Sequence, residues 1–305
     1  MTPDEIKNIP ASIRGRLQNK ARETGRVFSE ILQYYAMECF LNRLSMSKYI
    51  DRFFLKGALM LVAWQAPQNR PTIDIDFLAR IDNDLTNIES VIREICSIEV
   101  ESDGLRFDTE SIRSERIAED VQYEGIRVSF IAYLEKSRIN MQVDIAFHDK
   151  IYPKPIDIEY PRILKQKGSL NLKGYTMESV ISEKYEAMVK LGVINSRMKD
   201  FYDIWLLSKM YDFQGGILKE ALMATFTNRG TTIPQSDYPL SGALRNDMDK
   251  QKMWTAFIKV GRIQDAPERF GDVVDSIKRF LFPVLQSIIS KKDFNKRWSY
   301  SKNWK

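Results

Sequence analysis

The sequence contains very few of the side chains on which zinc proteins and many hydrolases depend. It has one histidine, His148, and two cysteines, Cys39 and Cys96. A zinc site of the Cys/His kind needs several such ligands in paired short spacings, so this chain cannot assemble one. A Ser-His-Asp or Cys-His mechanism would have to rest on His148 alone. The chemistry that remains available uses carboxylates and lysines, as metal-assisted phosphoryl transfer does.

Long hydrophobic runs and an export signal are also missing. The longest apolar stretch, residues 55–64, is broken by Lys56 and is too short to cross a bilayer. Residues 1–10 include acids and no hydrophobic signal core. Two isolated cysteines indicate reduced thiols, because secreted scaffolds of small size carry many. We therefore expect a cytoplasmic protein with no membrane segment.

Composition indicates a globular chain of ordinary charge. The 305 residues point to about two domains at roughly 150 residues each. Apolar residues make up 44% and charged residues 29%, which is too apolar for a disordered chain. The 46 basic and 41 acidic residues give a net charge of +5. That balance permits a polyanionic partner but does not require one.

Hydrophobic periodicity changes twice along the chain. It predicts helices at the start, then short strands mixed with helices, then a helical second half. We therefore expect an α+β fold with a mixed sheet, divided into residues 1–160 and 161–305. The predicted helices are two within 10–47, then 59–64, 82–98, 177–193, 198–211 and 273–290, and the predicted strands are 53–55, 72–79, 126–134 and 139–147.

The sharpest feature is the pair Asp74 and Asp76 on the predicted strand 72–79. Residues two apart on a strand point the same way, with Cα atoms roughly 6.6 Å apart. Two like charges there repel, and each carboxylate resists desolvation, so the sheet gains nothing from the pair by itself. Magnesium removes this penalty, because it binds one or two carboxylates together with substrate phosphate oxygens. Asp144, on the polar face of the predicted strand 139–147, could complete a set of three metal ligands.

An exposed edge strand would also display two acids in this spacing, and a lone DxD is common. The opposite face, however, consists of Ile73, Ile75 and Phe77, so we expect the strand to be packed rather than frayed.

Residues near this strand are suited to phosphate binding. Lys56 and Gly57 precede a predicted helix, whose N-terminal N–H groups would face a phosphate. Arg70 and Thr72 come just before the acids and could also contact phosphate.

A second cluster lies in the helical half. Lys184 either extends its ammonium from an apolar stripe or directs it at a triphosphate. Asp200 is either an ordinary acid at a helix start or a site residue, whereas Asp203 lies deep in an apolar segment. The two acids are three residues apart and would share a helix face.

The order of these motifs resembles the AbiEii-type nucleotidyltransferase toxins over roughly residues 10–210. The matching segments are Phe54-Leu55-Lys56-Gly57-Ala58, Arg70-Pro71-Thr72-Ile73-Asp74-Ile75-Asp76-Phe77, Glu183-Lys184 and Lys199-Asp200-Phe201-Tyr202-Asp203-Ile204-Trp205. One departure is Ala58, where the family usually has a second glycine.

The resemblance implies a polymerase-β-like nucleotidyltransferase core with a helical C-terminal half. It implies that Gly57 belongs to the phosphate-holding glycine motif and that Asp74 and Asp76 bind metal. Lys184 would then contact the nucleotide, and Asp200 or Asp203 would be a catalytic acid of the second half. Family members are the toxic halves of type IV toxin–antitoxin pairs linked to phage defence, each with a separately encoded antitoxin. Some relatives add nucleotides to tRNA 3′ ends and so stop translation.

Three functions therefore compete. The first is a Mg²⁺-dependent nucleotidyltransferase that uses a nucleoside triphosphate and modifies RNA, with tRNA as the expected acceptor. The basic, aromatic segment 291–305 suits such a partner, although a disordered end would have the same composition. The second is a non-catalytic nucleotide- or RNA-binding protein, which Ala58 favours. The third is a metal-dependent phosphodiesterase that uses the same carboxylates.

Overall fold

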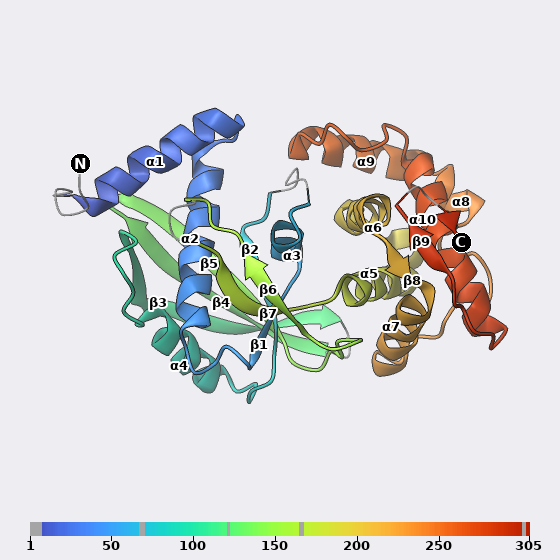
Figure 1. Ribbon diagram of the computed structural model, residues 1–305, viewed down its shortest axis with the longest axis horizontal. Coiled ribbons are helices and arrows are strands. Elements are labelled where there is room, and N and C mark those ends of the chain that lie inside the picture. Colours follow the sequence, from blue (N-terminus) through green and yellow to red (C-terminus); the bar gives the residue numbers. More distant parts are fainter. Residues whose placement is uncertain (1–7, 67–70, 121–122, 165–167, 301–302) are drawn as a thin grey trace. The chain divides into compact units, whose positions relative to one another are not determined.

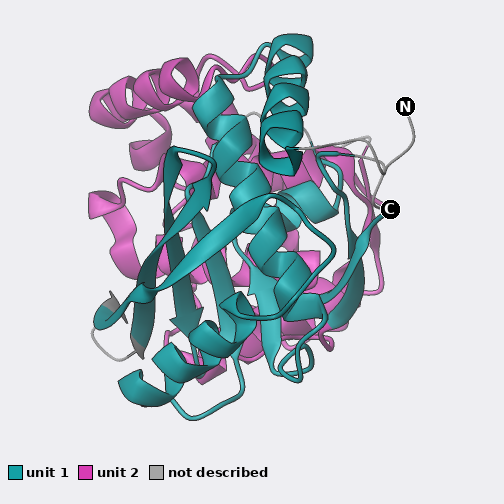
Figure 2. Cartoon of the chain, turned by 90° about the vertical axis from the view of Figure 1, so that its left-hand side faces the viewer, with its two compact units in different colours: residues 1–67, 71–148, 156–174 teal, residues 68–70, 149–155, 175–305 magenta. Residues whose placement is uncertain are grey.

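The computed structural model describes residues 8–66, 71–120, 123–164, 168–300 and 303–305. The chain forms two compact units, coloured separately in Figure 2. Unit 1 comprises residues 1–67, 71–148 and 156–174, and unit 2 comprises residues 68–70, 149–155 and 175–305.

Unit 1 is built on a seven-stranded mixed sheet in the order β3-β4-β5-β2-β1-β7-β6. β2 pairs in parallel with β5, and β1 in parallel with β7, whereas the other neighbours are antiparallel. The strands are β1 (Phe53–Lys56), β2 (Asp74–Ala79), β3 (Leu105–Asp120), β4 (Tyr123–Leu134), β5 (Ser137–Ala146), β6 (Ile156–Tyr160) and β7 (Leu170–Gly174).

Helices cover this sheet and close its core. They are α1 (Ile9–Thr24), α2 (Phe28–Ser45), α3 (Ala58–Ala63) and α4 (Leu85–Cys96). α2 lies across the sheet and contacts β5 and β7 (Figure 1). In the core, the ring of Phe40 on α2 meets that of Phe107 edge to face, with centroids 6.2 Å apart. Side-chain oxygens of Asn8 and Asp84 cap α1 and α4, which fixes where both helices begin.

Unit 2 is helical, with a small three-stranded sheet in the order β10-β9-β8. Helices α6 and α10 pack together through Phe201 and Phe270, whose ring centroids are 5.0 Å apart. The elements are α5 (Met177–Leu191), the 3₁₀ turn η3 (Gly192–Ile194), α6 (Met198–Met210), β8 (Phe213–Gln214), α7 (Gly215–Asn228), α8 (Gly242–Arg245), α9 (Met248–Gly261), α10 (Phe270–Ile289), β9 (Arg297–Ser299) and β10 (Asn303–Trp304).

The C-terminal segment is a structural part of unit 2. Trp298 is buried, and its indole N–H donates to the carbonyl of Ser208 at 2.7 Å. Trp304 donates to the carbonyl of Phe280 at 2.9 Å, and the two rings stack with centroids 5.8 Å apart. Trp298 is in the interior and Trp304 packs on Phe280, so the described part of this segment is not the disordered end that its composition also allowed. Tyr300 alone of the tail's large hydrophobic side chains in the described region is strongly exposed.

The predicted α+β class, with leading helices, a mixed sheet and a helical C-terminal half, is confirmed. Unit 1 continues to Gly174, beyond the predicted boundary at residue 160, because β7 pairs with β1 and carries β6 into the sheet. Ile73 was expected on the buried face of β2. It lies just before the strand and is 67% exposed.

Within the part of the chain that the structure describes, no helix is both long enough and apolar enough to span a membrane. Cys39 and Cys96 are unpaired and buried. Burial raises the pKa of the Cys96 thiol to about 12 and that of Cys39 well above its ordinary value. Both thiols are therefore protonated at neutral pH.

Candidate active site

Three aspartates of unit 1 converge on one face of the sheet. Asp74 and Asp76 project from β2, and Asp144 projects from the neighbouring parallel strand β5. One carboxylate oxygen from each lies within 4.8 Å of the others. Asp144 is buried, and the other two are half-buried. Hard divalent cations prefer oxygen ligands of this kind, so the three residues fit a metal site of the magnesium type.

The strand register extends this cluster into a row of charges across the sheet. Asp76 is directly beside Asp144 on one side and beside Lys56 of β1 on the other. Asp144 is in turn opposite Arg127 of β4, which is opposite Glu115 of β3. Directly paired residues on neighbouring strands point to the same face. The acids are therefore flanked by a lysine on one side and an arginine on the other.

Gly57 packs directly against Asp76. Its backbone has a φ of +70° and a ψ of −150°, a conformation that residues other than glycine rarely adopt. A Cβ atom at this position would lie 1.9 Å from Asp76 Oδ2. Glycine is thus required both by conformation and by space. Ala58 follows as the first residue of α3 and is buried, so the departure from the two-glycine pattern is accommodated by a helical residue inside the protein.

Thr72 orients the first acid. Its hydroxyl donates a short hydrogen bond to Asp74 Oδ1. Its backbone N–H donates to the Tyr34 hydroxyl at 3.3 Å, which ties this segment to α2. Thr72 is buried, so the expected role in phosphate contact would require its hydroxyl to leave Asp74. Arg70, also expected to bind nucleotide, lies outside the described residues.

Arg127 is a member of the site that the sequence pattern did not reveal. Its Nε donates to Asp144 Oδ1 at 2.9 Å and its Nη2 donates to Oδ2 at 2.8 Å. The hydrogen-bonded Asp144 carboxylate raises the pKa of the Arg127 guanidinium, with further contributions from Glu115 and Asp74. Arg127 follows no recognisable motif, so only the strand pairing could have placed it beside Asp144.

In unit 2, Lys184, Asp200 and Asp203 form an ion cluster in which both acids are buried and the lysine is half-buried. The Lys184 ammonium lies 2.7 Å from Asp200 Oδ1 and 2.9 Å from Asp203 Oδ2. Helix α5 supplies the lysine and α6 both acids. The structure therefore brings together the three unit 2 residues expected at the site, with the lysine in contact with both carboxylates. The predicted burial of Asp203 is correct.

A second ion cluster on α5 centres on Arg229. Its guanidinium contacts Asp149 at 2.8 Å, Glu186 at 3.0 Å and Glu183 at 3.4 Å. Burial lowers the pKa of Arg229, but the carboxylates of Glu183, Asp149 and Glu186 outweigh this and raise it. Three acids around one half-buried arginine hold α5 against the end of α7. We assign this cluster a structural role.

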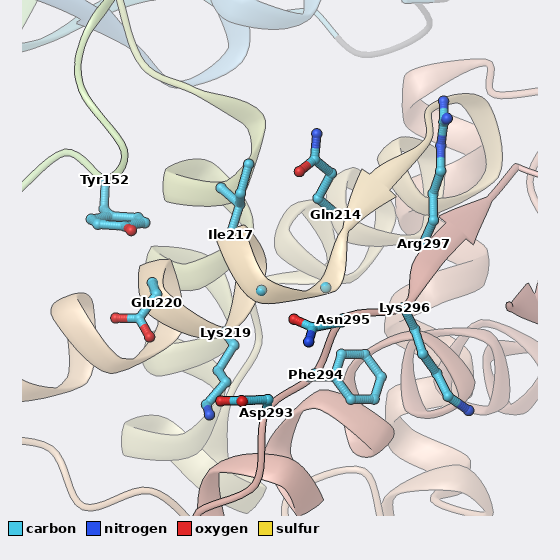
Figure 3. A pocket seen from close by; sticks show the side chains of 12 residues that line it. Tyr152, Gln214, Ile217, Lys219, Glu220, Asp293, Phe294, Asn295, Lys296 and Arg297 are labelled. Carbon is cyan, nitrogen blue, oxygen red and sulfur yellow. The ribbon is translucent and has the colours of Figure 1, made fainter.

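A cavity of about 640 Å³ opens in unit 2 between the start of α7 and residues 293–297 (Figure 3). Its lining mixes the bases Lys219, Lys296 and Arg297 with the acids Glu220 and Asp293. None of the residues predicted for catalysis lines it. Because its charges are mixed, the cavity does not define a ligand class.

Comparison with known proteins places the chain in a family. The model of the nucleotidyl transferase AbiEii toxin family of type IV toxin–antitoxin systems matches residues 39–276. The match covers most of the chain, so the protein belongs to this family and is a nucleotidyltransferase of the toxin type. The earlier resemblance is thereby confirmed.

Solved structures give only a distant likeness. JHP933 from Helicobacter pylori is 14% identical with a TM-score of 0.42, over 84% of this chain and 89% of that one. A presumed nucleotidyltransferase from H. pylori is 15% identical with a TM-score of 0.42, over 86% and 95%. Neither likeness is close enough to support a functional argument. Comparison with curated proteins gives no match.

Proposed function

We propose that the protein is a Mg²⁺-dependent toxin that transfers nucleotides from a nucleoside triphosphate to RNA, with the 3′ end of tRNA as acceptor, and so blocks translation. The observation that carries the proposal is the convergence of Asp74, Asp76 and Asp144 on one face of the sheet. Family membership supports a nucleotide substrate and an antitoxin partner. The acceptor, the metal and the effect on translation are our inferences.

The aspartate cluster suits in-line attack at phosphorus. When bound there, magnesium would offset the negative charge of the phosphates and the charge that develops on the attacking oxygen as its proton leaves. Asp74 and Asp76 would hold it from β2, and Asp144 would complete the set from β5. The oxygen of the acceptor hydroxyl would form a new bond to the α-phosphorus as the bond from that phosphorus to the α–β bridging oxygen breaks. Pyrophosphate would leave, and the hydroxyl proton would pass to solvent.

Lys56 and Gly57 support phosphate binding next to these acids. Lys56 is the cross-strand neighbour of Asp76, and it adds a compact positive charge beside the carboxylates. The absence of a side chain at Gly57 lets the turn pack against the Asp76 carboxylate, which brings the backbone of this turn beside a proposed metal ligand. Thr72 and Arg70 remain part of the proposed nucleotide site.

We further propose that Lys184, Asp200 and Asp203 contribute to activity from unit 2. In the structure the ammonium of Lys184 is held by two carboxylates, which fixes its position. A charge fixed in advance costs little reorganisation when it contacts a phosphate. The buried, unpaired cysteines are consistent with our proposed location in the cytoplasm.

The proposal is tested by incubating the protein with each α-³²P-labelled nucleoside triphosphate, Mg²⁺ and total RNA. Label is expected to move onto RNA of tRNA size, and periodate oxidation of the tRNA 3′ end should prevent it. RNA cleavage without label transfer would favour a phosphodiesterase. Nucleotide binding with neither reaction would favour a non-catalytic binding protein.

Asp76→Asn provides the negative control for this experiment, and Asp82→Asn is its matched control. Asp82 is an exposed acid of the same unit that belongs to no cluster of metal-ligand type among the described residues. Transfer should be lost in the first variant and retained in the second.

A further inference from the structure

The third carboxylate of the proposed metal site already has a positively charged partner. Both oxygens of Asp144 accept a hydrogen bond from the Arg127 guanidinium, at 2.9 and 2.8 Å. This two-point geometry is the strongest form of the arginine–carboxylate interaction. The side-chain amide of Gln142, turned with its oxygen toward the guanidinium, accepts from Arg127 Nε at 3.1 Å. Arg127 is therefore held firmly over the carboxylate.

The position of Arg127 makes it a partner for the whole acidic cluster. It lies in the same row across the sheet as Asp144 and Asp76, and its charge also interacts with that of Asp74. Three carboxylates this close repel one another unless a cation is present. Within the protein itself, Arg127 supplies such a charge from the β4 side.

We infer that Arg127 is a built-in counter-ion that competes with the divalent cation for the oxygens of Asp144. This inference rests on the proposed function, because it takes Asp74, Asp76 and Asp144 as the cation ligands. The guanidinium side chain is 35% exposed, whereas that of Asp144 is 10% exposed. The arginine thus has room to turn away toward solvent or a phosphate, and the aspartate does not.

Arg127 could act in a second way, by orienting Asp144 for the metal. The two roles predict opposite effects when the arginine is removed. Loss of a competitor strengthens metal binding, and loss of an orienting partner weakens it. Because Asp144 is buried in the centre of the sheet between β4 and β2, its side chain has few other orientations. We therefore expect the loss of competition to dominate.

The test is a titration with Mn²⁺ alone, followed by electron paramagnetic resonance of the free ion. Arg127→Gln should bind Mn²⁺ about tenfold more tightly than the wild type, which is an ordinary size for coupling between two ligands. Arg127→Lys keeps the charge but loses the two-point geometry, so it should bind within about threefold of the wild type. If Arg127→Lys instead bound Mn²⁺ as tightly as Arg127→Gln, the two-point geometry and not the charge would be what competes with the cation, which would contradict the counter-ion role.

Arg106→Gln is the matched control. It removes the same charge from β3 of the same sheet, where Arg106 stacks on Tyr133 at 4.7 Å. Tyr133 is paired across the strands with Arg138 of β5. Arg138 is six residues from Asp144 along that strand, which is roughly 20 Å at the rise of a strand, so this control position is far from the acids. Mn²⁺ affinity in this variant should equal that of the wild type.

A measurement on the wild type does not depend on any variant folding. The ¹⁵Nε–H resonance of Arg127 should shift during a Mg²⁺ titration, as the guanidinium leaves Asp144. An unchanged resonance at saturating Mg²⁺ would overturn the inference. So would equal or weaker Mn²⁺ binding by Arg127→Gln. If neither the wild type nor Arg127→Gln binds Mn²⁺, the proposed metal site is wrong as well. A failure of the inference about Arg127 is thus distinguishable from a failure of the metal site.

Discussion

The backbone of Gly57 lies so close to the carboxylate of Asp76 that a single added carbon would stand 1.9 Å from Oδ2. The glycine belongs to the turn between β1 and α3, and the aspartate to β2. Phosphate binding would explain the glycine at position 57. Its packing against Asp76, a proposed metal ligand, requires the same glycine. This relationship gives a sharp test of how the turn and the acids depend on each other.

Gly57→Ala should destabilise unit 1 and displace Asp76. The backbone conformation is nearly restricted to glycine, and the new methyl group overlaps the carboxylate, so we expect a loss of about 2–5 kcal/mol. Urea unfolding measures the change. Gly15→Ala is the control, because Gly15 lies within α1 with no atom near the added carbon, and it should gain about 0.5–1 kcal/mol. Equal effects at the two glycines would contradict this account.

Asp76→Ala should abolish both nucleotide transfer and growth inhibition. Loss of a metal ligand should reduce transfer by about 100-fold or more. Urea unfolding of the variant checks that it is folded. Growth of induced cultures and label transfer to RNA provide the readouts. Undiminished toxicity with a folded protein would refute the proposed mechanism.

Lys184→Met should destabilise unit 2 by about 3–5 kcal/mol, because it leaves two buried carboxylates without their partner. The triple variant that also carries Asp200→Asn and Asp203→Asn should recover most of this stability. Chemical denaturation of the three proteins measures the coupling. If the triple variant is as unstable as the single one, the uncompensated charges of Asp200 and Asp203 are not the cause of the instability. Transfer activity should be lost in both variants, including the one with restored stability.

Trp298→Ala should destabilise unit 2 by about 3–5 kcal/mol, as truncations of large buried side chains do. The ring is buried and its N–H is bonded to Ser208, so the variant loses packing and a hydrogen bond. Tyr300→Ala, at an exposed tail position, should change stability by no more than about 0.5 kcal/mol. Thermal unfolding distinguishes the two. Similar, small effects would mean that the tail is an appended segment after all.

Cys39 and Cys96 should resist alkylation at pH 8 in the native protein. With a pKa of about 12, Cys96 has a thiolate fraction of about one in ten thousand at that pH. Reactivity should rise with pH, because the thiolate is the reacting form. Mass spectrometry after iodoacetamide treatment provides the measurement, and guanidinium chloride should expose both thiols. Rapid labelling of the native protein would show that the core opens readily.

The sequence allowed much of this site to be predicted because strand alternation is a local pattern. Asp74 and Asp76 are two residues apart, so their shared face follows from the strand alone. The pairing of Asp76 with Asp144 is different, since it joins strands separated by two others in the chain. Its register is fixed by the packed sheet. Resemblance to a family, rather than periodicity, supplied the roles of Lys184 and Asp200.

The features that the sequence did not reveal are those set by distant partners. Arg127 acquires its role only because β4 pairs with β5 in a particular register. The tail looked like a nucleic-acid surface because aromatic and basic residues alternate there. Trp298 is instead buried inside unit 2, and Trp304 stacks on Phe280. Composition does not distinguish an exposed ring from a buried one.

The proposed metal site is tested most directly by a crystal soaked with Mn²⁺ and a non-hydrolysable nucleoside triphosphate, with an anomalous difference map calculated at the manganese edge. Our account predicts a peak within bonding distance of carboxylate oxygens of both Asp74 and Asp76, with nucleotide phosphate beside it. A map with bound nucleotide and no manganese at these two residues would contradict it.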